Sequence, residues 1–171
     1  LDDLDAKAAS SGAKFFMLSH MRGHIADMER VLEICDRYGI RLIEDCAHTM
    51  GAKWQGQRSG NFGAVGCFST QTYKHMNSGE GGFLTTDDEE IAARAVILSG
   101  SYMLYERHSA APDDDVFRRI RLDTPNCSAR LDNLRAAILR AQLAHLDENC
   151  ARWNARYQAL EAGLRDKAGV G

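Results

Sequence analysis

The chain has 171 residues and a formal net charge of −3, with 44% hydrophobic and 26% charged residues. These values are typical of one globular unit, and the slight negative charge argues against a nucleic-acid-binding protein, which normally carries a basic face. No apolar run is long enough to cross a bilayer, and the acidic start at 1–3 does not fit a signal peptide, so we expect a cytoplasmic protein without membrane contact.

The first part of the chain alternates between helical patterns and short apolar runs. A polar, helix-like segment at 1–14 comes first, and an amphipathic helix is predicted at 27–39, where Gly39 ends it. The expected strands lie at 15–20, 40–46, 64–70 and 81–86. Strand, helix and strand in this order predict the α/β class, a mostly parallel sheet flanked by helices. Such sheets place binding sites at the carboxyl ends of their strands.

The next helix is expected to begin at Thr86, with Glu89 completing a capping box, and to end at Gly100. Its predicted buried side comprises Ile91, Ala95 and Leu98. Periodicity is then lost over 101–127, which predicts a loop-rich connector with an exposed acidic loop at 111–116 and a basic, partly extended stretch at 117–125.

Apolar residues then recur at alternating spacings of three and four, which predicts one long helix with a seam that needs a partner surface. The seam residues are Leu143, Leu146, Cys150, Trp153, Tyr157, Leu160 and Leu164. The sheet has no evident first strand and the chain ends soon after the seam. We therefore expect a fragment of a longer protein.

The five cysteines are odd in number and form no C-x-x-C pair. Three of them lie in apolar runs, where a free cysteine behaves as a small hydrophobic residue. Because no clustered ligand spacing exists, we predict reduced thiols and no metal site.

Lys74 lies in the segment STQTYKHMNSGEGG at 69–82, five residues after Ser69 and five before a glycine cluster. A lone lysine is more often a surface residue in a turn. When it is partly buried, however, it loses hydration and its pKa falls, so that the neutral amine can attack a carbonyl and form a Schiff base.

Two neighbouring strand ends favour this chemistry. Asp45 ends an apolar strand, where its carboxylate can hold an aromatic cofactor nitrogen protonated, as proteins do with pyridoxal phosphate. Capping of a following helix is the alternative for Asp45. Ser69 ends the next strand, where its hydroxyl and nearby amides can hold a phosphate. The glycines of SGEGG allow close approach to a flat ligand, or form a flexible turn.

The segments IEDCAHTMGA at 43–52 and GNFGAVGCFSTQTYKHMNSGEGG at 60–82 resemble the DegT/DnrJ/EryC1/StrS sugar aminotransferases, pyridoxal-phosphate enzymes of fold type I. The shared features are an acidic pair with Gln or His three residues after the Asp, a G-x-x-G-x-F-S strand, a serine five residues before the lysine, and G-E-G-G. The resemblance extends from Ser19 to Asp147.

The resemblance implies roles for individual residues. Lys74 would carry the cofactor and move a proton between the substrate carbon and the cofactor, and Asp45 would pair with the pyridine nitrogen. Ser69 would bind the phosphate, and His48 would lie at the ring oxygen or face, where many members have Gln. A lone histidine is otherwise as often a satisfied core residue. His20 also matches a family histidine, for which we expect a structural role.

The implied activity moves an amino group from an amino acid such as glutamate to a keto-sugar carried on a nucleotide, in a homodimer. Substrate phosphates could meet a basic stretch that a solvated surface explains equally simply, comprising Arg118, Arg119 and Arg121. The alternative is a catalytically silent, truncated binding or regulatory module that keeps the fold. A sugar dehydratase branch of the family has His at the lysine position, and Lys74 argues against it.

Two departures from the family pattern stand out. Ser128 occupies a position where many relatives have an Asn that reaches the cofactor of the neighbouring subunit. Family members are also much longer chains. We therefore expect residues 1–128 to form part of the cofactor-binding large domain and residues 129–171 to form a helical segment that leads toward a small domain absent here.

Overall fold

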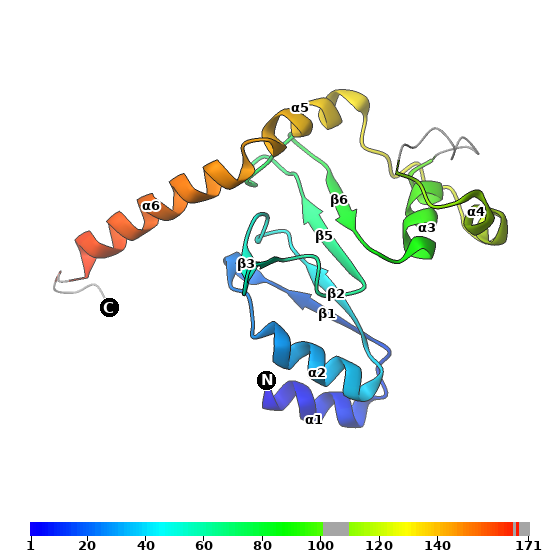
Figure 1. Cartoon of the computed structure of the whole chain (residues 1–171), viewed down its shortest axis with the longest axis horizontal. Coiled ribbons are helices and arrows are strands. Elements are labelled where there is room, and N and C mark those ends of the chain that lie inside the picture. The colour runs from blue at the N-terminus through cyan, green and yellow to red at the C-terminus, as the bar shows by residue number, and fades with distance from the viewer. Residues whose placement is uncertain (101–109, 166, 168–171) are drawn as a thin grey trace.

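The computed structural model describes residues 1–100, 110–165 and 167 (Figure 1). Its centre is a four-stranded sheet in the order β1-β2-β5-β6. The strands are β1 (Phe15–Ser19), β2 (Arg41–Asp45), β5 (Val65–Ser69) and β6 (Gly82–Thr85). The first three are parallel and β6 is antiparallel to β5, so the expected α/β class with a mostly parallel sheet is confirmed. A separate antiparallel hairpin consists of β3 (Lys53–Trp54) and β4 (Gln57–Arg58).

Two helices pack together beside β1 and β2 (Figure 1). They are α1 (Asp2–Ser11) and α2 (Met28–Tyr38). The Asp27 side chain caps α2 by accepting the amide of Arg30 at 3.1 Å, and Gly39 at φ 63° ends it, as its missing Cβ allows. The shared core comprises Ala8, Met28, Val31, Ile34, Cys35, Ile40 and Leu42. The short 3₁₀ turn Met21–Gly23 lies between β1 and α2, and its Arg22 lines the candidate site.

The helix α3 (Glu89–Ser99) begins later than its sequence suggested, and the prediction of Thr86 as its cap is wrong. The Asp88 carboxylate is the cap, accepting the amides of Glu90 and Ile91 at 3.0 Å each. The Thr86 hydroxyl is engaged elsewhere, donating to the carbonyl of Ala64 at 2.7 Å. The predicted buried side is also wrong, because its residues are half-buried and the fully buried positions are Ala93 and Ile97.

A second correction concerns the connector, since residues 114–120 form the helix α4 (Asp114–Ile120) instead of a loop. The acidic residues lie in its first turn and the basic residues in its last, an arrangement that the helix dipole favours. Its apolar side packs against α3 and comprises Val116, Phe117 and Ile120. The part of the predicted loop at 101–109 lies outside the described residues.

The C-terminal part consists of α5 (Asn133–Leu143) and α6 (Leu146–Leu164), so the predicted single seam helix is interrupted. Leu143 belongs to α5 and the other seam residues to α6. Leu139 and Leu146 are buried against the end of the sheet in a cluster with Cys46, Met50, Phe68 and Met76. Figure 1 shows α6 extending away from the sheet, and its seam residues beyond Cys150 are exposed.

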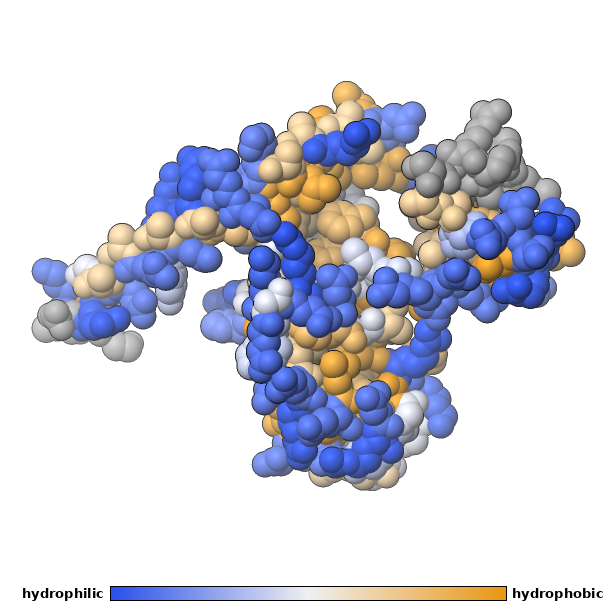
Figure 2. Space-filling view, in the orientation of Figure 1, coloured by the Kyte–Doolittle hydropathy of each residue, from blue (hydrophilic) through white to orange (hydrophobic). Residues whose placement is uncertain are grey.

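Apolar side chains are also exposed on the sheet. Figure 2 shows such residues gathered between α5 and the lower part of the molecule. On β1, Phe15 and Met17 are 63% and 65% exposed, and Phe83 and Leu84 of β6 are 38% and 41% exposed. No helix among the described residues is long and apolar enough to span a membrane.

Gly66 of β5 lets two backbone segments approach closely, and its replacement by alanine should be destabilising. A Cβ at this position would lie 2.4 Å from Gly60 Cα and 2.6 Å from the Gly60 carbonyl oxygen. We expect Gly66→Ala to lower the free energy of unfolding by about 1–3 kcal/mol in urea denaturation. Gly163→Ala on α6 is the matched control, since nothing lies within 4 Å of its Cβ position. Equal unfolding free energies of the two variants would contradict the inference that Gly60 leaves no room for a Cβ at position 66.

Candidate active site

Asp45 and Ser69 lie at the same edge of the sheet because they end parallel strands. Ser19 of β1 pairs with Asp45 of β2, and Asp45 pairs with Cys67 of β5, two residues before Ser69. Lys74 follows in the loop between β5 and β6. Asp45, Ser69 and this loop therefore lie at the carboxyl edge, where the parallel topology places binding sites.

The Asp45 carboxylate is held in place by two hydrogen bonds. The Ser19 hydroxyl donates to its Oδ2 at 2.8 Å, and the Ala47 amide donates to its Oδ1 at 3.1 Å. These bonds hold the pKa of Asp45 below its usual value, although partial burial opposes them. The side chain is therefore an anion at neutral pH. The helix-capping alternative is not what the structure has, because the residues after β2 form turns.

Ser69 and Lys74 are positioned by a loop that closes on itself. The Thr70 amide donates to the Gly81 carbonyl, and the Ser78 amide donates to the Thr70 carbonyl, each at 2.9 Å. Within this closed loop, the Lys74 amide donates to the Gln71 carbonyl at 2.9 Å. The Ser69 hydroxyl accepts the amide of Gln71 at 3.3 Å. These contacts place a hydroxyl and a tight turn directly before the lysine.

The half-buried Lys74 side chain lines a pocket of about 350 Å³. The other lining residues are Arg22, Ala47, His48, Met50, Tyr73 and His75. The structure thus brings two of the predicted site residues, Lys74 and His48, into one pocket. Asp45 and Ser69 lie outside this lining, at the neighbouring strand ends.

The hydrogen bonds of the two pocket histidines indicate where each ring carries its proton. His48 Nδ1 accepts the amide of Arg22 at 3.0 Å, so neutral His48 carries its proton on Nε2 and can donate it to a ligand. His75 Nδ1 lies 2.9 Å from the carbonyl of Met50, an acceptor, so Nδ1 carries the proton and Nε2 is the acceptor. Arg22 was not a predicted site residue, because an arginine in a turn carries no signal of its own in the sequence.

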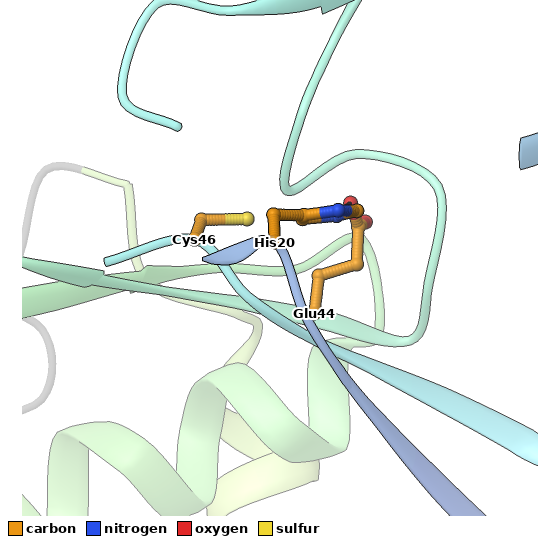
Figure 3. A group of neighbouring side chains, drawn as sticks. All are labelled: His20, Glu44 and Cys46. Atoms are coloured by element: carbon orange, nitrogen blue, oxygen red, sulfur yellow. Dashed lines mark hydrogen bonds and ion pairs between the residues drawn. The ribbon is translucent and has the colours of Figure 1, made fainter. Parts of the chain in front are cut away.

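A second group of side chains lies on the other face of β2 and is fully buried (Figure 3). Figure 3 shows the ring of His20 directed at the carboxylate of Glu44, with Cys46 near the base of that histidine. His20 Nε2 lies 3.2 Å from Glu44 Oε2. His20 is 2% exposed, consistent with the structural role expected for it.

The Glu44 carboxylate also accepts three backbone amides from the loop before β5. The Gly60 amide donates to Oε2 at 2.9 Å, and the amides of Phe62 and Gly63 donate to Oε1 at 2.7 and 2.9 Å. Burial alone would raise the pKa of Glu44, but the bonds from His20 and the three amides outweigh it and lower the pKa below its usual value. Glu44 is therefore an ionised brace that joins β2, the end of β1 and this loop.

The donor atoms of His20, Glu44 and Cys46 lie within 4.8 Å of one another, a grouping that the sequence spacing did not reveal. Both carboxylate oxygens of Glu44 already accept two hydrogen bonds each, which occupies their lone pairs. Burial raises the pKa of the Cys46 thiol to about 11, so this sulfur is protonated. These contacts describe a hydrogen-bonded interior cluster.

The mostly parallel sheet and its flanking helices have the fold of the pyridoxal-phosphate aminotransferases of fold type I. Within this class, the chain belongs to the DegT/DnrJ/EryC1/StrS aminotransferase family, whose family model matches residues 5–171.

Named relatives agree with this membership. The dTDP-3-amino-3,4,6-trideoxy-alpha-D-glucose transaminase of Streptomyces venezuelae is 34% identical over 170 residues, which cover 96% of this chain and 40% of the relative. The 3-amino-5-hydroxybenzoate synthase of Amycolatopsis mediterranei is 36% identical over 166 residues, which cover 96% of this chain and 40% of the relative. The chain therefore spans about two fifths of the length of these relatives.

Solved structures show the same likeness. A crystal structure of 3-amino-5-hydroxybenzoic acid synthase has a TM-score of 0.74 at 32% identity, covering 98% of this chain and 42% of that one. A structure of S. venezuelae DesV in complex with a ketimine intermediate has a TM-score of 0.68 at 34% identity, covering 92% of this chain and 38% of that one.

Proposed function

We propose that this chain forms the lysine-bearing part of a cytoplasmic, pyridoxal-phosphate-dependent aminotransferase. It would move an amino group from an amino acid to the keto group of a sugar carried on a nucleotide. The observation that carries the proposal is the half-buried Lys74 in a pocket at the carboxyl edge of the sheet, beside the strand that ends in ionised Asp45. A homodimer, and a division into a cofactor-binding part at 1–128 and a helical part at 129–171, belong to the same proposal.

The donor set of the site fits this cofactor. Asp45 is an anion at a strand end, Lys74 supplies an amine, and Ser69 supplies a hydroxyl beside the turn at 71–74. When bound, the cofactor supplies an electron sink for charge at the amino-bearing carbon. Asp45 would keep the ring nitrogen protonated, Ser69 would hold the phosphate, and His48 would donate from Nε2. The Lys74 amine would move the proton at the reacting carbon.

The substrate class is supported by several relatives. Two of their names contain a nucleotide-linked sugar, a dTDP-sugar transaminase and a GDP-perosamine synthase. A third, an L-glutamine:2-deoxy-scyllo-inosose aminotransferase, names an amino-acid donor but no nucleotide. A structural neighbour that is 25% identical, with a TM-score of 0.69, is a GDP-4-keto-6-deoxymannose-3-dehydratase. Lys74 favours amino transfer over this dehydration, because a Schiff base with the cofactor needs an amine.

Borohydride reduction followed by peptide mass mapping tests the proposal directly. We expect one reduced cofactor per chain after incubation with pyridoxal phosphate, on the peptide that contains Lys74. The reduction traps only a carbon–nitrogen double bond, so it separates a covalent linkage from loose binding. An adduct confined to other lysines, or no adduct in the protein as expressed from its gene, would favour the catalytically silent module instead.

A further inference from the structure

Arg22 occupies a backbone conformation that needs support from its surroundings. It lies in the 3₁₀ turn after β1 with φ 55° and ψ 25°, in the left-handed region that residues with a side chain seldom adopt. The turn is held by the bond from the Arg22 amide to His48 and by the His20 amide, which donates to the Asp45 carbonyl at 3.1 Å. These two hydrogen bonds attach the turn that contains Arg22 to His48 and to the backbone of Asp45.

The side chain of Arg22 is exposed and lines the same pocket as Lys74 and His48. The pocket is lined by Arg22, Lys74 and two histidines but by no carboxylate, and the anionic Asp45 lies at the neighbouring strand end. Within the described residues Arg22 forms no ion pair. Other arginines of the described residues do pair with carboxylates, among them Arg30, Arg37, Arg41, Arg58, Arg94, Arg118 and Arg135.

We propose that Arg22 binds the α-carboxylate of the amino-acid donor and so helps to select that substrate. A guanidinium presents a planar fork of donors that matches a carboxylate in two hydrogen bonds. The turn with Arg22 at φ 55° places this residue in the lining of the lysine pocket. The inference rests on the proposed function, which brings an amino acid to Lys74.

Geometry favours a carboxylate over the phosphate of a nucleotide-linked sugar. In an α-amino acid the carboxylate is bonded directly to the carbon that carries the amino group, so it reaches the pocket together with the reacting atom. The phosphate of a nucleotide-linked sugar is separated from the keto carbon by the sugar ring. A cation in the same 350 Å³ pocket as Lys74 is therefore placed for the shorter of the two spacings.

Calorimetric titration with glutarate tests this inference, because glutarate presents carboxylates but has no amino group and cannot react. In the cofactor-loaded protein, we expect Arg22→Gln to weaken glutarate binding about tenfold or more, since a charged hydrogen-bond partner is lost. Arg22→Lys should give an intermediate loss. Arg152→Gln is the control: it removes an exposed arginine of α6 that lies outside the pocket, and glutarate binding should be unchanged.

A second titration, with UDP, distinguishes the carboxylate from the phosphate. Arg22→Gln should leave UDP binding within twofold of the wild type. Loss of UDP binding with unchanged glutarate binding would overturn the inference, as would equal glutarate binding in Arg22→Gln and Arg152→Gln. Borohydride adducts are measured on the same samples to distinguish this inference from the proposed function. If Lys74 carries the adduct but Arg22→Gln does not change glutarate binding, the role of Arg22 is contradicted and the proposed function is not.

Discussion

Replacement of Lys74 by arginine should abolish the covalent cofactor linkage and lower kcat for amino transfer by about 10²–10⁴-fold, the usual contribution of a positioned acid–base group. Arginine keeps the positive charge and most of the length of the side chain. Its guanidinium cannot be deprotonated in a protein, so it offers neither a nucleophilic amine nor a base. The variant therefore separates the chemistry of Lys74 from its charge.

A truncated variant and a matched lysine control sharpen this experiment. Lys74→Ala leaves a space in a pocket that a small primary amine can enter, so methylamine should restore part of the activity. Lys53→Ala removes an exposed lysine of the β3–β4 hairpin outside this pocket and should retain the wild-type kcat. The activity is measured as amino-group transfer by the protein as expressed from its gene. Turnover of Lys74→Arg within tenfold of wild type would remove Lys74 from the proposed mechanism.

The most regular elements could be predicted from the sequence because local signals agree with tertiary packing there. In α2 the apolar positions Met28, Val31 and Cys35 repeat at helical spacing, and Asp27 and Gly39 provide both ends. The strands were located by their apolar runs, and the parallel rule placed Asp45 and Ser69 at one edge. The antiparallel direction of β6 could not be predicted, since a period of two residues identifies a strand but neither its partner nor its direction.

The errors arose where one residue had two possible contacts or where a helix was short. Thr86 and Asp88 can both cap a helix, and the structure uses Asp88 because the Thr86 hydroxyl bonds to Ala64, 22 residues away. The helix α4 has only 7 residues, too few for a clear apolar period, and its charged ends resembled a solvated loop. The roles of Arg22 and Glu44 depend on contacts with residues 16–26 positions away, which no local pattern contains.

Replacement of Glu44 by glutamine should lower the free energy of unfolding by about 3 kcal/mol, because it breaks a fully buried charged network. The amide keeps the shape of the carboxylate but has only one acceptor oxygen. Its nitrogen would face either the Phe62 and Gly63 amides or the Gly60 amide and His20. Two donors would then meet a third donor in the interior, whichever way the side chain turns.

The pH dependence of the same variant identifies the charge as the cause. Because the pKa of Glu44 is lowered in the folded chain, its ionisation stabilises the fold above the unfolded value of about 4.3, and this contribution is lost as the pH falls through the lower folded value. The difference in unfolding free energy between wild type and Glu44→Gln should therefore be full at pH 7 and shrink below about pH 4. Subtracting the variant removes the contributions of the other carboxylates, including Asp45.

An exposed glutamate provides the reference for both measurements. Glu161→Gln on α6 should change the unfolding free energy by less than about 0.5 kcal/mol at either pH, because its side chain is solvated. If Glu44→Gln matched this control at pH 7, the four bonds to Glu44 would contribute no net stability. A loss at pH 7 that persisted unchanged in acid would attribute the effect to packing instead of charge. The expected pattern, large at neutral pH and smaller in acid, follows only if the buried carboxylate is ionised and bonded as the structure has it.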